Sequence, residues 1–243
     1  MRLDFVSEES WLAAMVGDFE ELTRAAMSEG RDVFHVSLAG GATPLPFYRR
    51  LAASPTLSAS QGPRIHFWVG DERAVPPDSH ERNGFAIAKA LAPAIEGLAA
   101  WRRPPELHLW PSGERAQCAK TYAQEFLSHF PLAHGGREPG FDLSILGMGV
   151  DGHTAGIFPP LGDGGGEDEA GRDSKGRTIL TQAPGEPRDR MTFSIRLLSG
   201  SAAIIVPVRG KEKLPALEAF ERGEKSPIGL AAGKKGRIYY LET

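Results

Sequence analysis

The sequence of 243 residues has little that would direct it to a membrane or an oxidising compartment. Its single cysteine, Cys118, cannot form an internal disulfide, and it falls within an apolar helical pattern that predicts a buried thiol. No apolar run approaches the length of a membrane span, and the first residues lack the apolar core of a signal peptide. We therefore expect a cytoplasmic protein that makes no contact with a membrane.

A strong charge of either sign is also missing. The formal net charge is −3 and the pI is near 6.2, so nothing favours binding to nucleic acid. Hydrophobic residues make up 41% and charged residues 24% of the chain, an ordinary balance for a globular protein with a normal core. Any positive potential that holds an anionic ligand must therefore be local.

Strand-like and helix-like patterns alternate along the chain. Short apolar runs predict strands at 3–6, 33–38, 65–69, 143–146, 202–206 and 238–241. Helices are expected from a Ser7 N-cap to about Gly30, from Thr43 as N-cap with Pro44 first, from Asn83 to Pro93, from Cys118 to Phe130, and after Gly210. This order predicts one α/β domain over 1–243, with a mostly parallel sheet, and the Gly- and acid-rich stretch 161–176 predicts a mobile loop.

Four unusual segments each follow a predicted strand. They cover residues 39–44, 70–73, 147–153 and 209–213. Ligands of open α/β sheets bind beyond the carboxyl ends of the strands, where segments of this kind meet. The sequence therefore predicts one binding site at that edge of the sheet.

The segment at 39–44 could bind an anion. Gly40 and Gly41 would let backbone N–H groups approach a ligand, and Ala42 and Thr43 lead into a helix with its positive end toward the site. Thr43 also offers a hydroxyl group. An ordinary tight turn would use the same residues, so both interpretations remain open.

Charged residues distinguish the second and fourth segments. Asp71 and Arg73 end a buried strand, where arginine could face a phosphate or carboxylate, although a solvated turn would look the same. Lys211 and Lys213 open a helix, where a positive charge opposes the helix dipole. An anionic ligand would account for these lysines, and plain solvation is the alternative.

The segment at 147–153 carries the clearest chemistry. Gly149 and its neighbouring glycines predict an open loop that presents Asp151 and His153 to a ligand. Histidine is the natural general base near neutral pH. A structural histidine or half of a metal site is the alternative, but no partner at zinc-site spacing lies nearby, so we expect no metal.

Together these segments resemble the 6-phosphogluconolactonase family, within a group that includes glucosamine-6-phosphate deaminases. The similar stretches are 38–44, 68–76 with Asn83, 146–159, Arg190 to Thr192 and Gly210 to Lys213, in order over most of the chain. The chain departs from the family at Arg82, Gly84 and Gly156, where Ser, an aromatic residue and Ser are usual. The resemblance implies a Rossmann-like, doubly wound fold with helices on both faces of the sheet.

The resemblance also implies an activity, the hydrolysis of 6-phosphoglucono-1,5-lactone to 6-phosphogluconate in the oxidative pentose phosphate pathway. No cofactor is expected, because an ester carbonyl is already electrophilic, and a monomer is expected. His153 would be the general base, Asp151 would orient its imidazole or brace the loop, and Arg73 would steady the oxyanion. The remaining expected site residues, for phosphate or substrate binding, are Gly40, Gly41, Ala42, Thr43, Asp71, Gly149, Arg190 and Lys213.

Two alternatives remain. A deaminase of the same group would carry a glutamate for proton transfer after its Asp-Gly-His motif, but this chain has Phe158 at that place. A non-catalytic sugar-phosphate sensor would usually carry a DNA-binding domain, for which the short N-terminus has no room. Both considerations favour the lactonase.

Overall fold

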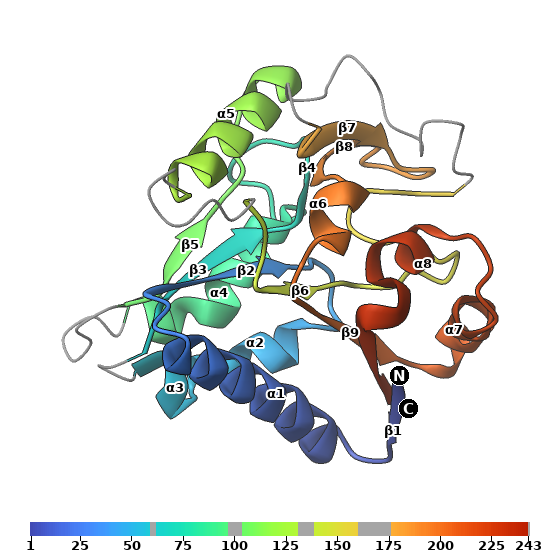
Figure 1. Cartoon of the computed structure of the whole chain (residues 1–243). Helices are drawn as coiled ribbons and strands as arrows, with labels where there is room; N and C mark the ends of the chain where they lie inside the picture. Colours follow the sequence, from blue (N-terminus) through green and yellow to red (C-terminus); the bar gives the residue numbers. More distant parts are fainter. Residues whose placement is uncertain (59–61, 97–103, 131–138, 160–175, 243) are drawn as a thin grey trace.

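The computed structural model describes residues 1–58, 62–96, 104–130, 139–159 and 176–242. A parallel sheet of seven strands lies at its centre, in the order β1-β10-β9-β6-β2-β3-β5 (Figure 1). Its strands are β1 (Arg2–Phe5), β2 (Val33–Leu38), β3 (Arg64–Val69), β5 (Glu106–His108), β6 (Leu143–Ile145), β9 (Ala203–Arg209) and β10 (Gly236–Leu241). This confirms the predicted α/β fold with a mostly parallel sheet.

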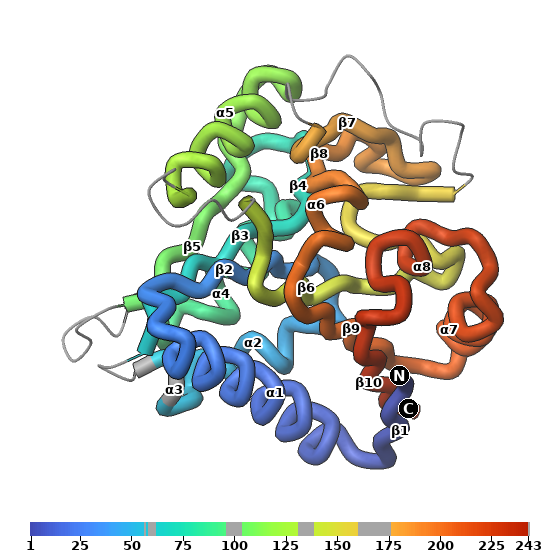
Figure 2. The backbone as a smooth tube through the Cα atoms, viewed as in Figure 1, coloured from blue at the N-terminus to red at the C-terminus, as the bar shows by residue number. Residues whose placement is uncertain are grey.

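Helices cover both faces of this sheet. The main ones are α1 (Glu8–Ser28), α2 (Leu45–Ala52), α3 (Pro55–Ser58), α4 (Asn83–Glu96), α5 (Arg115–Ser128), α6 (Ile195–Ser199), α7 (Leu214–Glu221) and α8 (Pro227–Ala232), with 3₁₀ turns at Lys211–Lys213 and Gly233–Lys235. In Figures 1 and 2, α1, α2 and α4 lie on one face, and α5 and α6 lie on the other. Among the described residues, no helix is both long and apolar enough to cross a membrane.

A second, antiparallel sheet of three strands was not predicted. It consists of β4 (Asp71–Arg73), β8 (Asp189–Phe193) and β7 (Thr178–Gln182), in that order. Two of its strands carry charged residues instead of an apolar run, so the rule that finds buried strands misses them. The small sheet lies beside α5 and brings β8 next to the end of β3 (Figure 1).

All five predicted helices are present, but the boundaries of α2, α4 and α5 differ, since α5 begins at Arg115 and not at Cys118. The helices α3, α6 and α8 and the strand β5 were not predicted. Ser7 caps α1, and its Oγ accepts a hydrogen bond from Ser10 N at 3.3 Å. Thr43 is not an N-cap, because α2 begins at Leu45 and Pro44 occupies the cap position. The helix expected to stop at Pro93 continues to Glu96, since a proline near the last turn removes only one helical hydrogen bond.

Two further expectations concern Cys118 and the loop at 161–176. Cys118 is buried in α5, as predicted. The expected mobile loop, except for its last residue, lies outside the described residues.

The strand order places a crevice at the centre of the sheet. From β2 the chain proceeds outward through β3 to β5, and from β6 it proceeds the other way through β9 to β10. Such a reversal separates the loops that follow the two central strands and leaves space between them for a ligand. The loops after β2 and β6 are the predicted segments 39–44 and 147–153.

Candidate active site

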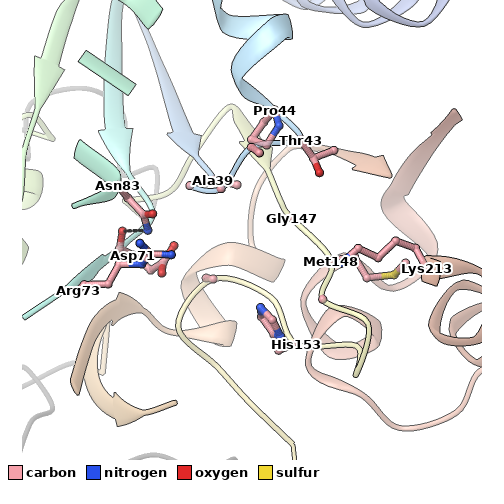
Figure 3. Close-up of a pocket in the computed structure, with 15 residues that line it drawn as sticks. Ala39, Thr43, Pro44, Asp71, Arg73, Asn83, Gly147, Met148, His153 and Lys213 are labelled. Atoms are coloured by element: carbon pink, nitrogen blue, oxygen red, sulfur yellow. Dashed lines mark hydrogen bonds between the residues drawn. The ribbon is translucent and has the colours of Figure 1, made fainter. Parts of the chain in front are cut away.

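A cavity of about 240 Å³ opens at the carboxyl ends of the central strands. Segments that follow β2, β3 and β6, together with Lys213 after β9, form its wall. Figure 3 shows Arg73 and Lys213 on opposite sides of this cavity, with His153 between them. The structure therefore brings all four predicted segments to one pocket.

His153 lines this pocket from the loop after β6, and Asp151 of the same loop contacts His153 without lining the pocket itself. His153 Nδ1 lies 2.6 Å from Asp151 Oδ1, and the same carboxylate oxygen accepts a hydrogen bond from the His153 backbone N–H at 3.1 Å. Both side chains are 37% exposed. Asp151 therefore both orients the imidazole and braces the loop, and its contact with Nδ1 leaves Nε2 for other partners.

The pKa of Asp151 reflects this contact. Partial burial acts to raise the pKa, but the backbone N–H and the imidazole of His153 outweigh it, and the pKa of Asp151 lies below its usual value. The carboxylate of Asp151 is therefore ionised down to a lower pH than an ordinary aspartate.

Gly149 makes this arrangement possible. A Cβ at position 149 would lie 2.0 Å from His153 Nδ1 and 2.5 Å from Asp151 Oδ1. The loop closes through hydrogen bonds from Gly149 N to His153 O at 2.9 Å and from Thr154 Oγ1 to Gly147 O at 2.7 Å. Gly149 thus allows His153 and Asp151 to pack closely against the loop. The sequence had predicted only that the glycines leave the loop open to a ligand.

Glu72 organises the wall formed by β4, although no role was predicted for it. Its fully buried carboxylate accepts hydrogen bonds from Arg73 N, Asn83 N and Gly84 N at 2.7–2.9 Å, at the first turn of α4. Arg82 lies beside it, with Nε at 3.4 Å. Glu72 could have been recognised from its position in a charged triplet that follows a buried strand.

Packing accounts for the residues at positions 82, 84 and 156, where the chain departs from the family that it resembles. The buried Arg82 donates to Trp110 O and Ser112 Oγ at 2.6 Å, so it compensates Glu72 and joins two loops. A Cβ at Gly84 would approach Glu72 Oε2 at 3.1 Å. A Cβ at Gly156 would lie 2.9 Å from Thr192 Cβ, so the glycine permits a close approach of the loop to β8.

Asn83 links the wall at β4 to the loop after β2. Its Nδ2 donates to the backbone oxygen of Asp71 at 2.9 Å, and a Cβ at Gly40 would lie 2.1 Å from the Asn83 side chain. Gly41 has φ +83°, a conformation that favours glycine. The local structure therefore requires glycine at both positions of the segment that was predicted to bind an anion. Both glycines line the cavity.

The pKa values of Asp71 and Arg190 differ from their ordinary values. Burial, and then the neighbouring Glu72, raise the pKa of Asp71 to about 6, although Arg73, Arg190 and Asn83 oppose the shift. Burial and then the charge of Arg73 lower the pKa of Arg190.

The predicted cations do not all reach the pocket. Arg73 and Lys213 line it, whereas Lys211 forms an exposed ion pair with Glu242 at 2.9 Å. Arg190 is buried and is not a lining residue, since its Nη1 donates to Pro187 O. Its guanidinium carbon lies 5.9 Å from the centre of the Phe158 ring. The remaining predicted residues Gly40, Gly41, Ala42, Thr43, Asp71 and Gly149 all line the cavity.

Phe158 contacts the histidine directly. Its ring centre lies 4.8 Å from that of His153, with an angle of 40° between the planes. This side chain packs between His153 and Arg190 and supplies no titratable group.

The amino-acid sequence matches a described protein family over nearly its whole length. The model of the glucosamine-6-phosphate isomerases/6-phosphogluconolactonase family matches residues 7–240. The chain is 32% identical over 217 residues to 6-phosphogluconolactonase from Thermotoga maritima, covering 88% of this chain and 86% of that protein. It is 30% identical over 245 residues to the human GDH/6PGL endoplasmic bifunctional protein, of which it spans only 28% of the length.

Solved structures show the same fold. A 6-phosphogluconolactonase structure from Thermotoga maritima superposes with a TM-score of 0.75 at 27% identity, with full coverage of both chains. The structure of 6-phosphogluconolactonase from Trypanosoma brucei has a TM-score of 0.74 at 25% identity, with coverage of 100% of this chain and 95% of that one.

Proposed function

This chain belongs to the glucosamine-6-phosphate isomerase/6-phosphogluconolactonase family, and from its pocket we propose that it hydrolyses 6-phospho-D-glucono-1,5-lactone to 6-phospho-D-gluconate. The observation that carries the proposal is the His153–Asp151 pair at a cavity that also contains Arg73 and Lys213. Catalysed hydrolysis of an anionic lactone needs a base to activate water, a cation at the oxyanion and a cation at the phosphate, and the pocket has one base and two cations. The proposal extends to a cytoplasmic enzyme that acts as a monomer in the oxidative pentose phosphate pathway.

His153 would supply the base. Its Nε2 takes a proton from a water molecule while the water oxygen bonds to the C1 carbonyl carbon of the lactone. The tetrahedral intermediate then breaks its bond from C1 to the ring oxygen, and the imidazolium returns the proton to that oxygen. Asp151, which stays ionised, stabilises the imidazolium between the two transfers.

The cations would divide the remaining work. Arg73 would stabilise the oxyanion on C1 and then the product carboxylate, because it lines the cavity on the side opposite Lys213 (Figure 3). The phosphate would bind to Lys213 and the backbone of Gly40 to Thr43, across the cavity from Arg73. Arg190 would brace Phe158 instead of contacting phosphate, given its bond to Pro187.

Phe158 argues against the deaminase alternative. Deamination of an amino-sugar phosphate moves protons between neighbouring carbons and opens a ring, which calls for further acids and bases. Phe158 packs on His153 where the deaminase signature carries glutamate, and its ring transfers no proton. The pocket therefore suits the simpler hydrolysis.

The test is a direct assay of both reactions with the pure protein. We expect loss of 6-phosphogluconolactone well above the spontaneous rate, and no ammonia from glucosamine 6-phosphate. Ammonia release at a rate comparable to lactone hydrolysis would overturn the assignment, and so would a lactone loss equal to the background.

A further inference from the structure

Three histidines gather on the face of the sheet that α5 covers. His66 lies on β3, His108 lies on the edge strand β5, and His129 is the C-cap residue of α5. A ligand atom of each lies within 4.8 Å of the other two. None of the three lines the cavity described above, so this cluster has no role in the proposed reaction.

We propose that His66, His108 and His129 bind one divalent transition-metal ion of the Zn²⁺ class. Zinc binds imidazole nitrogen at about 2.0–2.1 Å, which places neighbouring ligand atoms of a tetrahedral site about 3.3 Å apart. His66 Nδ1 and His108 Nε2 are already 3.0 Å apart. With the third nitrogen within 4.8 Å, small side-chain rotations complete the set, and the strands need not move.

His108 has the surroundings of a metal-binding histidine. Its Nδ1 lies 2.6 Å from Glu125 Oε1, so the carboxylate holds the proton on Nδ1 and the Nε2 lone pair points into the cluster. The Trp68 ring stacks on the imidazole at 3.7 Å between centres, with an angle of 8°. Metal-ligating histidines usually donate their second N–H to such an outer carboxylate, which fixes the ring and raises its basicity.

One proton must move before a metal ion binds between His66 and His108. With the proton of His108 on Nδ1 toward Glu125, His66 Nδ1 is the donor of the 3.0 Å hydrogen bond to His108 Nε2. When the His66 proton moves to its own Nε2, the lone pairs of His66 Nδ1 and His108 Nε2 are both available to the ion.

Glu106 offers a fourth ligand. Its Oε2 lies 3.8 Å from His66 Nδ1, and its side chain is 41% exposed on the edge strand. Nitrogen-rich ligands of this kind suit Zn²⁺, Co²⁺ or Ni²⁺, whereas Mg²⁺ and Ca²⁺ prefer oxygen.

The test is a titration of the chelator-treated whole chain with Zn²⁺, followed by calorimetry and by thermal unfolding. We expect one ion per chain and a rise in Tm that a chelator reverses. Co²⁺ should give the visible absorption of an imidazole-bound ion, and Mg²⁺ should give no heat. Absence of stoichiometric Zn²⁺ binding by the wild-type chain overturns the proposal.

Two substitutions locate the ion. His129→Asn, at the end of α5, should weaken Zn²⁺ binding at least about tenfold, whereas the exposed His80→Asn should leave it unchanged. His153→Gln tests the histidine–carboxylate pair of the candidate active site. Binding that is lost in His153→Gln and kept in His129→Asn places the ion in the active site and contradicts the proposal.

A further measurement covers the case in which His129→Asn does not fold. X-ray absorption at the zinc edge of the wild-type protein counts imidazole ligands without any substitution. At least two imidazoles are expected for this cluster. A single imidazole would instead match the His153–Asp151 pair and would overturn the assignment.

Discussion

Two histidine–carboxylate pairs of this chain share one hydrogen-bond distance and differ in their surroundings. His153 Nδ1 lies 2.6 Å from Asp151, and His108 Nδ1 lies 2.6 Å from Glu125. The His153 side chain is 37% exposed beside a cavity, whereas the His108 side chain is 8% exposed and stacked under Trp68. In both pairs the carboxylate fixes Nδ1 and leaves Nε2 to act.

The environment of Nε2 therefore decides the chemistry. At His153 the neighbours are a cavity, two cations and a phenyl ring, which suit a base that exchanges protons with water and substrate. At His108 the neighbour is the Nδ1 of a second imidazole at 3.0 Å, which suits a shared proton or a metal ion.

Removing the base should have the largest effect. His153→Gln should lower kcat by about 10²–10⁴, the usual worth of general acid–base catalysis, while the fold stays intact. Steady-state kinetics with the lactone, corrected for spontaneous hydrolysis, measures it. His129→Asn serves as the matched change in the other cluster, and an equal loss of kcat there would end the comparison.

Displacing the His153–Asp151 pair without removing it should cost less. Gly149→Ala places a methyl group 2.0 Å from the present position of His153 Nδ1 and should lower kcat by about 10² through misplacement of the ring. Gly17→Ala in α1, where a Cβ meets nothing within 4 Å, is the control. It should keep full activity and add up to about 1 kcal/mol of stability. Unchanged kcat in Gly149→Ala would show that the close packing of the pair is unimportant.

The pKa values of Asp71 and Asp151 are shifted in opposite directions, because only Asp71 is buried. Its pKa is about 6 in the folded chain and 3.8 ordinarily, so between these pH values the folded state binds the extra proton. Its contribution to stability is then fully present below pH 3.8 and is lost as pH rises through about 6.

Asp71→Asn removes this dependence. Relative to that variant, the wild type should lose about 2–3 kcal/mol of unfolding free energy between pH 4 and pH 7. Urea unfolding of both proteins across this range measures the difference. The Asn83 hydrogen bond uses the backbone oxygen at position 71, so it survives the change. A constant difference across pH would mean that Asp71 titrates normally.

The loss of a single phosphate contact should have the smallest effect. Lys213→Ala should weaken 6-phosphogluconate binding by about 1.5–3 kcal/mol and leave gluconate nearly unaffected, because only the phosphorylated ligand needs the charge. Calorimetry with both ligands decides this. Lys211→Ala is the control, since Lys211 pairs with Glu242 outside the pocket. Equal weakening of both ligands by Lys213→Ala would assign the lysine a structural role.

Much of the fold could be predicted because its signals are local. The Ser7 cap, the apolar runs of β2 and β3, and the glycines at 147–152 each act over a few neighbouring residues. The alternation of these elements determined a parallel sheet, and the carboxyl ends of its strands determined where His153 and Arg73 had to lie. The loops that carry these residues meet at the pocket because the carboxyl ends of parallel strands lie at one edge of the sheet.

Other features depended on strand order and packing, which no local pattern encodes. The short, charged strands β4 and β8 form a sheet only because they pair with each other, and this pairing places Arg190 behind Phe158 and outside the pocket. His66, His108 and His129 are distant in sequence and become neighbours only when β5 pairs with β3 and α5 packs across them. The sequence by itself therefore determined the fold class and the position of the proposed general base. Only the tertiary structure decided which cations line the pocket and that a histidine cluster exists, because those depend on contacts between distant segments.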